Sequence, residues 1–338
     1  MKSVKAVITG IIACLIISTT STSTIAQNKI LRADSTNPAG SSSILLTVLG
    51  KIFPRETGVS LQLNTGQTLT RSVLKLGTGD LEMMPMVPQI IPWLKAGKKM
   101  YKKKLQKQAK KAYANSRAIF GFPASAIHIM TWQDSGIKTL ADIKGKVVYM
   151  GPPAGGFWVQ STSYIKAVTG LTPKDFKAVR LPWGQGMQAM LDGKLDVFLR
   201  PTAIGSAVIN QIGAKNKFYL LGAGKAADSK QWKEVMIKRL KNDNITIPAG
   251  TYPNQLGGDA RTTIANNSIL VRADMDDKLI YKLVKATWEN LDEIHKSAVV
   301  LKTLSPKNPF AGVNLPLHPG AVKYYNEVGI KIPAEILP

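Results

Sequence analysis

The feature that most constrains the fold is an order of strand-like and helix-like segments that occurs twice along the chain. The first occurrence places strands and helices alternately at 30–36, 43–53, 59–66, 67–76 and 79–87. The second places them in the same order at 146–150, 157–168, 178–184, 185–191 and 193–200. Matching residues keep a nearly constant separation, since Gly40 and Gly156 lie 116 positions apart and Leu81 and Leu195 lie 114 apart. The pattern predicts two similar α/β lobes with largely parallel sheets.

The chain must also cross between these lobes. A β-rich run at 119–131 predicts the first crossing, and 245–253 predicts the second. A strand at 262–274 and an amphipathic helix at 276–297, opened by Asp274 or Asp276, would return to the first lobe. We therefore expect lobe 1 at 27–123 plus 249–338, and lobe 2 at 124–248.

Each lobe offers two loops that precede a predicted helix, at 36–42, 64–68, 151–157 and 182–186. In open α/β sheets, ligands lie beyond the carboxyl ends of the strands. Backbone N–H groups and helix dipoles at such loops suit a small anion. The predicted ligand-binding residues are Asn37, Gly40, Ser41, Ser42, Thr65, Gly66, Gln67, Ala154, Gly155, Gly156, Phe157, Trp158, Trp183, Gln185 and Arg200.

Arg200 and the aromatic residues are included because amide groups alone bind too weakly. Arg200 ends the last strand of the second lobe, where a charge-assisted hydrogen bond would contribute about 1.5–3 kcal/mol. Phe157, Trp158 and Trp183 flank the second-lobe loops and would wall an apolar or aromatic group. The alternatives are that Arg200 reaches the outer surface and that the rings pack under their own helices.

The N-terminal segment has the layout of a secretory signal peptide. Lys2 and Lys5 precede an apolar run at 6–17, and small residues lead to a cleavage site after Ala26. Residues 1–26 are therefore expected to be removed from an exported, periplasmic protein; lipidation at Cys14 is the less favoured alternative. Without Cys14 the remaining chain has no cysteine, which excludes disulfides and thiolate chemistry.

The positive charge is concentrated in one place. The formal net charge is +24, and residues 95–111 contain nine lysines and no acidic residue. We expect one helix with a solvated lysine face; a polyanion-binding exported protein is the alternative function. Aromatic stacking platforms and RNA-binding signatures are missing, so nucleic acid is not an expected partner.

No motif predicts an enzyme, a cofactor or a metal. The loop at 151–157 lacks both the Gly-Lys-Ser/Thr ending of a triphosphate-binding loop and the dinucleotide fingerprint. The three histidines are scattered: His128 is expected to be a hydrogen-bonded core residue, His295 to lie late in a helix, and His318 in a turn.

The chain resembles the TAXI family, the extracytoplasmic solute receptors of one class of TRAP transporters. The resemblance rests on "KTLADIKGKVVYMGPP", "IPAGTYPNQ", "ILVRADMDDKLIYKLVKATWENLDEI" and "LPLHPGAVKYYNEVG", together with "NTGQT" and "GDLEMMPM". It implies a type II periplasmic-binding-protein fold, a monomer that captures a small organic acid, often an amino or oxo acid, and delivery to TRAP membrane subunits. An ABC permease or a sensor is the alternative partner, and a secreted enzyme on the same scaffold is a further alternative.

The departures from the family pattern fall in the predicted ligand loops. Thr65-Gly66-Gln67-Thr68 replaces the usual Thr-Gly-Gly-Ser, and Ala154-Gly155-Gly156-Phe157 follows the paired prolines in place of Gly-Ser-Gly-Thr. The resemblance therefore extends to the scaffold and not to the identity of the ligand.

Overall fold

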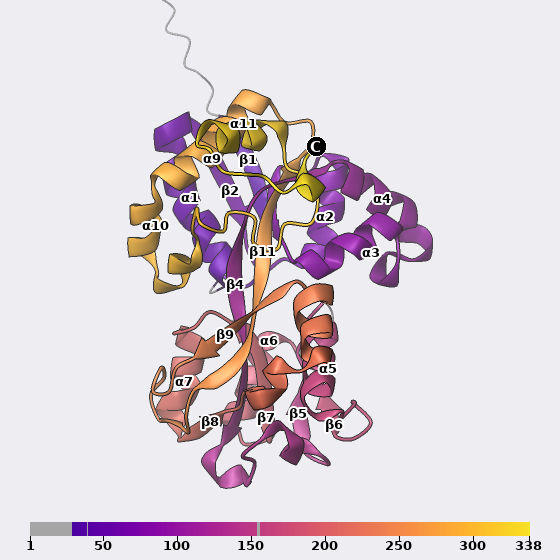
Figure 1. Cartoon of the computed structure of the whole chain (residues 1–338), viewed down its shortest axis with the longest axis vertical. Helices are drawn as coiled ribbons and strands as arrows, with labels where there is room; N and C mark the ends of the chain where they lie inside the picture. Colours follow the sequence, from indigo (N-terminus) through magenta and orange to yellow (C-terminus); the bar gives the residue numbers. More distant parts are fainter. Residues whose placement is uncertain (1–28, 39, 154–155) are drawn as a thin grey trace, which may run out of the picture.

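Two long antiparallel strands connect the two halves of the molecule. The computed structural model describes residues 29–38, 40–153 and 156–338. In it, β4 (Ser116–Trp132) and β11 (Ala260–Arg272) pair along most of their lengths and run from an upper lobe into a lower one (Figure 1). The run at 119–131 is thus confirmed as a crossing strand. The expected signal peptide, including Cys14, and the loop residues Ala154 and Gly155 lie outside the described residues.

The twofold order of segments is confirmed in both lobes. The upper lobe contains β1 (Lys29–Asp34), α1 (Ser41–Thr57), β2 (Val59–Asn64), α2 (Leu69–Thr78) and β3 (Met83–Met86). The lower lobe contains β5 (Val147–Tyr149), α5 (Phe157–Thr169), β6 (Lys177–Val179), α6 (Trp183–Leu191) and β7 (Val197–Thr202). The strand expected at 178–184 is shorter than the sequence predicts, and Trp183 begins a helix instead.

The sheet order shows that the two lobes share one topology. The upper strands follow the order β2-β1-β3-β11 and the lower ones β6-β5-β7-β4. In each lobe the first three strands are parallel, and the crossing strand is antiparallel to the third. The carboxyl ends of the parallel strands in both lobes therefore point toward the junction between the lobes.

The remaining elements cover these two sheets. In the upper lobe they are η1 (Pro88–Ile90), α3 (Ile91–Ala96), η2 (Lys99–Tyr101), η3 (Lys103–Leu105), α4 (Gln106–Ala114), α9 (Asp277–Glu289), α10 (Leu291–Ser297), η8 (Val299–Thr303), α11 (Pro319–Glu327) and η9 (Ala334–Ile336). In the lower lobe they are η4 (Gln133–Ser135), η5 (Leu140–Ile143), α7 (Ala207–Lys215), β8 (Phe218–Leu220), η6 (Gly224–Asp228), α8 (Lys230–Trp232), the π-helix η7 (Lys233–Arg239), β9 (Asn242–Ile247) and β10 (Gln255–Leu256).

Each lobe has its own apolar core, and the stretch of β11 between the cores is polar. The upper core draws its buried residues from 31–124 and 269–336. Two lower clusters, one on each face of the lower sheet, draw theirs from 126–260. Between them, β11 carries Asn266, Asn267 and Ser268, and its register against β4 shifts between Ala265 and Asn266. The lobes therefore meet at two strands whose middle contributes little apolar packing.

The second crossing differs from the sequence prediction. Tyr252 is buried in the lower lobe, and β10 pairs with β8, so the chain at 245–253 does not leave that lobe. The crossing takes place later, in β11, because the apolar side chains that follow β9 (Tyr252, then Ala260) already pack in the lower core. We infer that the upper lobe resumes within β11 and not at 249.

Two predicted helices are also divided. The segment at 276–297 forms α9 and α10, which meet at Asn290, and Asp276 caps the first helix by accepting a hydrogen bond from the Leu279 N–H at 2.8 Å. Residues 95–111 do not form one helix. Gly97 adopts φ = 60° and ends α3, and two short 3-10 turns follow before α4 begins. Nine like charges on one helix face would repel one another, and the turns separate them.

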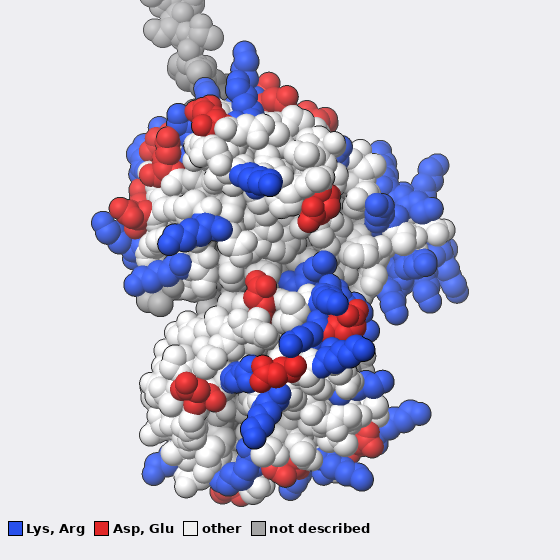
Figure 2. All heavy atoms as spheres, viewed as in Figure 1, with Lys and Arg blue, Asp and Glu red and all other residues white. Residues whose placement is uncertain are grey.

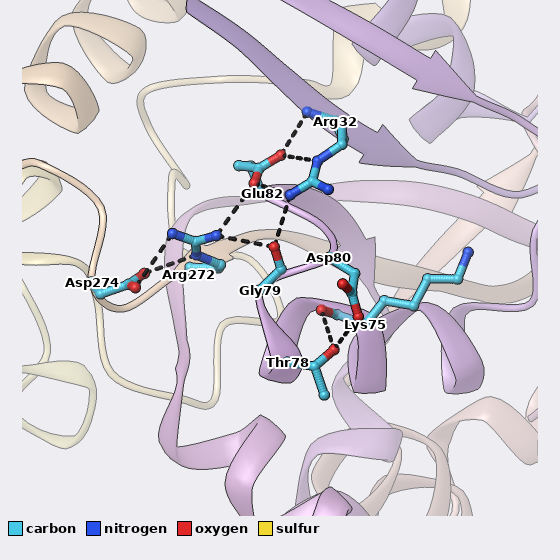
Figure 3. A network of polar contacts seen from close by, with 8 residues as sticks. All are labelled: Arg32, Lys75, Thr78, Gly79, Asp80, Glu82, Arg272 and Asp274. Atoms are coloured by element: carbon cyan, nitrogen blue, oxygen red, sulfur yellow. Dashed lines mark hydrogen bonds and ion pairs between the residues drawn. The ribbon is translucent and has the colours of Figure 1, made fainter.

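The far end of the upper lobe is held by a shared carboxylate. Glu82 accepts hydrogen bonds from the Arg32 backbone N–H at 2.8 Å and from the Arg32 guanidinium at 2.7 and 2.9 Å, and it forms an ion pair with Arg272 at 3.3 Å (Figure 3). Burial by itself would raise the pKa of Glu82, but the hydrogen bonds from Arg32 and the charge of Arg272 outweigh it and lower the pKa. Glu82 thus ties β1 and the start of β3 to the end of β11.

We expect Glu82→Gln to lower the free energy of unfolding by about 1–3 kcal/mol, because the amide keeps the shape but loses the charge that two guanidinium groups share. Since folding lowers the pKa of Glu82, its contribution is complete above the ordinary value of 4.5 and is lost as the pH falls through the folded-state pKa. Urea unfolding at neutral pH and below 4.5 measures both effects. Glu234→Gln, which removes an exposed pair with Lys238, is the control and should change little.

Candidate functional site

Arg200 lies near the carboxyl end of β7 with its charge unpaired. Its side chain is only 6% exposed, and its Nε atom is buried without a hydrogen-bond partner. No ion pair or hydrogen bond joins its guanidinium to any described residue; its Cζ atom lies 5.1 Å from the centre of the Trp183 ring. Burial lowers the pKa of Arg200, opposed by its interaction with Tyr149. Since a buried charge without a partner is costly, an anion bound here would recover that cost.

The aromatic residues beside Arg200 form one cluster. It contains two of the three predicted aromatic residues, Phe157 and Trp183. The Trp183 ring lies 5.5 Å from Phe157 and 6.1 Å from Tyr149, and Tyr149 stacks on Phe198 at 5.0 Å. Phe157 is buried, whereas Trp183 is half-buried at the first turn of α6. The structure therefore brings Phe157, Trp183 and Arg200 together, from the starts of two helices and the end of one strand.

Trp158 lies outside this cluster and contacts Arg180, a residue that was not predicted from the sequence. The exposed Arg180 lies over the Trp158 ring at 4.7 Å. Its guanidinium donates hydrogen bonds to the carbonyl oxygens of Pro152, at 3.2 Å, and Pro153. Arg180 follows β6 directly, and this place at the carboxyl end of a parallel strand is the signal that could have identified it. Its guanidinium contacts the two prolines that come soon after β5.

The four helices that follow the predicted loops begin without a capping side chain. The N-cap positions of α1, α2, α5 and α6 are Gly40, Thr68, Gly156 and Pro182, and none of them supplies a side-chain hydrogen bond. By contrast, Asp276 and His318 cap α9 and α11. The first-turn N–H groups of the four helices therefore donate no hydrogen bond to an N-cap side chain. The same is true of many helix N-termini that bind anions.

In the upper lobe, several of the predicted groups already have hydrogen-bond partners. The Gly66 and Gln67 N–H groups donate to the carbonyl oxygens of Thr36, at 2.6 Å, and Ser35, at 2.8 Å. The Gln67 side chain donates to the Thr65 carbonyl at 3.2 Å. An anion would have to compete with these bonds, so we assign this loop a structural role in joining the ends of β1 and β2.

The start of α1 is similarly engaged with the crossing strands. The Ser41 hydroxyl donates to the Ala124 carbonyl in β4 at 2.7 Å, and the Ser42 hydroxyl accepts from Asn267 in β11 at 2.6 Å. The Asn37 carbonyl accepts from the Gly40 N–H at 2.8 Å in the preceding loop. These contacts position α1 at the junction and leave the Ser42 hydroxyl proton and the backbone N–H groups of the first turn for a ligand. Gln185 is exposed on the first turn of α6.

The two lobes come into contact where α5 begins. A Cβ atom on Gly156 would lie 3.3 Å from Ile90 Cδ1 and 3.7 Å from Gln89 Nε2, both in η1 of the upper lobe. The Gln89 side chain is 5% exposed, and its Oε1 atom has no hydrogen-bond partner. Gln89 is not among the residues predicted from the sequence. The repeat could have identified it, because η1 follows β3 in the upper lobe at the place where the loop after β7, the strand that carries Arg200, lies in the lower lobe.

His128 supports Arg200 from the neighbouring strand and stays neutral. It is the cross-strand partner of Arg200 and is fully buried. Its Nδ1 donates to the Ala126 carbonyl at 3.0 Å, so its Nε2 accepts from the Tyr252 hydroxyl at 2.6 Å. Burial, together with the charge of Arg200, lowers the pKa of His128 to about 4. Both ring nitrogens are occupied, which confirms the prediction of a hydrogen-bonded core residue.

The other candidate sites carry no comparable chemistry. Surface concavities of about 550, 310 and 210 Å³ lie on outer faces of the lobes, beside α10, between α5 and η7, and beside α2. Within the described ranges, no group of three or more His, Cys, Asp or Glu side chains is placed to hold a metal ion. His318 and His295 are accounted for as the α11 N-cap and as a hydrogen bond to the Leu304 carbonyl at 2.8 Å.

We expect the stability of the wild type to decrease as the pH falls from 6.5 toward 4. In that interval the unfolded chain protonates His128 while the folded protein holds it neutral, so the unfolded state is favoured. His128→Gln should be less stable at neutral pH and should show a smaller decrease; a part remains, because burial also lowers the pKa of His318. Urea unfolding across the interval tests this, with His295→Gln as the control that keeps it. A wild type whose stability is constant over the whole interval would contradict the assignment.

Solved structures with this architecture are known. The chain is similar to one described as a periplasmic transporter, at 14% identity over 90% of this chain and 94% of that one, with a TM-score of 0.53. It is also similar to PhnD1 from Prochlorococcus marinus (MIT 9301) in complex with methylphosphonate, at 10% identity, 90% and 99% coverage and a TM-score of 0.49. A third is the periplasmic sulfonate-binding protein SsuA of a putative sulfonate ABC transporter from Methylobacillus flagellatus KT, at 14% identity, 88% and 76% coverage and a TM-score of 0.47.

At such low identity these likenesses show the fold alone, which is the type II periplasmic-binding-protein fold that the resemblance implied. Among the described residues, no helix has the length and apolarity needed to cross a membrane.

The model of one protein family matches residues 94–329, which is more than half of the chain. The match does not identify the TAXI group in particular, so the TAXI assignment stays a prediction. The chain belongs to the NMT1-like family.

Proposed function

We propose that the chain is an extracytoplasmic solute-binding protein that captures a small organic anion between its lobes and delivers it to a membrane permease. The observation that carries this proposal is Arg200, a buried guanidinium without an anionic partner among the described residues. It lies where the carboxyl ends of the lower strands face the upper lobe, next to two helices whose N-termini are uncapped. An anionic head group placed there would pair with Arg200 and meet the N-terminal N–H groups of α5 and α6.

The energetics indicate what else the ligand carries. Micromolar affinity corresponds to about −8 kcal/mol. A charge-assisted hydrogen bond contributes about 1.5–3 kcal/mol and each helix N-terminus about 0.3–1 kcal/mol, while association costs at least about 4 kcal/mol. The difference must come from burial of apolar surface, at about 25 cal/mol per Å². Trp183, which is half-buried beside Arg200, provides that surface, whereas Phe157 is already buried in the lower core and supports the Trp183 ring. The proposed ligand is therefore a carboxylate, or an acid of similar charge such as a sulfonate or phosphonate, that carries an apolar or aromatic group.

The junction between the lobes suits capture by closure. Only β4 and β11 carry the chain across, and their middle is held by side-chain hydrogen bonds, not by a continuous apolar core. Asn266 donates to Asp243 at 2.9 Å and to the Lys241 carbonyl at 3.1 Å. A hinge of this kind absorbs small backbone changes and lets the lobes close on a ligand. The closed form would be the one that the permease recognises.

For the permease, we favour the ABC type over the TRAP type. The TRAP partner rests on the TAXI resemblance of the sequence, whereas the family model places the chain in the NMT1-like family. A TRAP-type permease and a sensor remain the alternatives. A catalytic function has no support in the site, because His128 is neutral and both of its ring nitrogens are occupied.

We expect Arg200→Ala to weaken binding of the solute roughly 10- to 100-fold, because it removes the charge-assisted bond. A thermal-shift panel of carboxylates, sulfonates and phosphonates, guided by native mass spectrometry of the purified protein, first identifies a ligand. Calorimetry then compares the wild type with Arg200→Ala and with Arg239→Ala, which removes an exposed arginine bonded to Ser163 on an outer face. Unchanged affinity in Arg200→Ala, or an equal loss in both variants, would remove Arg200 from the site.

We expect Trp183→Leu to weaken binding of aromatic anions more than binding of aliphatic anions of equal charge, because it removes the ring that walls the site. Trp158→Leu is the control, since Trp158 contacts Arg180 and not Arg200. The readout is the ratio of the two dissociation constants in each variant. A ratio that stays the same in Trp183→Leu would place the apolar part of the ligand elsewhere.

A further inference from the structure

The lysine-rich segment at 95–111, hereafter the basic segment, is firmly attached to the upper lobe. Tyr101 is 1% exposed, and its hydroxyl donates to the Thr70 carbonyl at 3.0 Å. Ala112, just beyond the segment, packs so closely on α2 that a Cβ atom on Gly77 would lie 2.5 Å from its Cα. The segment is therefore a rigid projection of the fold, with a buried inner side and a free outer side.

The outer side carries a large positive charge that the protein does not neutralise. All nine lysines are exposed, and none forms an ion pair with a described residue. Figure 2 shows their side chains gathered at the side of the upper lobe, over α3 and α4, with no acidic side chain among them. Such a cluster repels itself in the free protein and is relieved by a surface of opposite charge.

The backbone of the segment holds lysines in an unfavourable conformation. Lys99 and Lys103 have φ angles of 57° and 55°, in the left-handed region that favours glycine and asparagine. Two of the four non-glycine residues with positive φ among the described residues thus lie in this short stretch. The two turns interrupt the helical path, so the lysines project from three short elements and not from one continuous helix.

Apolar side chains lie on the same free side. Met100 is 38% exposed and Leu105 is 36% exposed, and they are two of only five large hydrophobic residues that the described chain exposes to this extent. Exposed apolar groups surrounded by lysines are typical of surfaces that bind at the boundary between lipid head groups and acyl chains. Single-stranded nucleic acid is typically bound on exposed aromatic rings, but Tyr101, the aromatic residue of the segment, is buried. The segment also has no arginine, the residue that forms paired hydrogen bonds with carboxylates of an acidic protein.

We propose that the basic segment docks the protein on a membrane surface of anionic phospholipid. The lysines would supply long-range attraction to the phosphate head groups, and Met100 and Leu105 would enter the interface. The surface is separate from the site at Arg200, but α3 follows η1, so docking would bring the junction between the lobes close to the membrane. This last consequence rests on the proposed function, whereas binding to lipid does not.

Co-sedimentation with vesicles tests the proposal. Vesicles of phosphatidylglycerol and phosphatidylcholine in equal amounts should bind the protein, and vesicles of phosphatidylcholine alone should not. Replacing Lys98, Lys99, Lys103 and Lys104 by Gln should lower the partition coefficient at least about tenfold. The matched control replaces four exposed lower-lobe lysines, Lys166, Lys174, Lys177 and Lys217, and should lose far less. In Met100→Ser/Leu105→Ser, the part of the binding that survives raised salt should disappear.

Several results would overturn the proposal. Equal losses in the two lysine variants would show that net charge, and not this surface, causes binding. An absence of binding to phosphatidylglycerol vesicles, with salt-sensitive binding to polyglutamate or to DNA, would assign the segment to another polyanion. Calorimetry of solute binding by the lysine variant separates the two proposals, because lipid docking predicts an unchanged solute affinity, and failure at Arg200 would leave the vesicle result unaffected.

Discussion

The antiparallel pairing of β4 with β11 is the interaction on which the arrangement of the two lobes depends. Each lobe builds a parallel sheet of three strands against one of these crossing strands, so the pairing fixes how the two sheets face each other. It also fixes the direction of the parallel strands, whose carboxyl ends meet at the junction. The polar middle of the pair, at Asn266 and Asn267, keeps the two apolar cores separate. Each lobe is therefore stabilised by its own core, which suits the closure between lobes that we propose.

The positive charges of the protein are of two kinds, one buried and one exposed. Arg200 is a single buried charge held beside a neutral histidine and an aromatic ring, in surroundings of low polarity where an opposite charge is worth most. The lysines of the basic segment are hydrated and exposed, and each is worth little alone. In the functions that we propose, the first arrangement selects a small ligand by pairing and shape, whereas the second favours an extended anionic surface. In the upper lobe, Glu82 shows the opposite use of charge, because its two arginine partners serve the fold.

Much of the fold could be predicted because it is repeated. Gly40 and Gly156 precede corresponding helices in the two lobes, and β3 and β7 begin 114 positions apart, so errors in single elements did not obscure the order. Arg200 was found by its place at the end of the last strand. Gln89 and Arg180 were missed because their roles depend on contacts across the junction and with a loop. The run at 245–253 has the pattern of a crossing strand, but packing of Tyr252 against His128 keeps it in the lower lobe.

The sequence by itself determined the two α/β lobes, the crossing strand at 119–131 and the arginine at the end of β7, because apolar periodicity and chain order encode them locally. Only the tertiary structure decided which groups remain free to bind. The N–H groups of Gly66 and Gln67 look available in the sequence, yet they donate to the neighbouring loop, and the hydroxyl of Ser41 donates to β4. For the same reason, the guanidinium of Arg200 has no anionic partner among the described residues. Whether a polar group has a hydrogen-bond partner depends on residues that are distant in the chain. The local sequence pattern does not identify those residues.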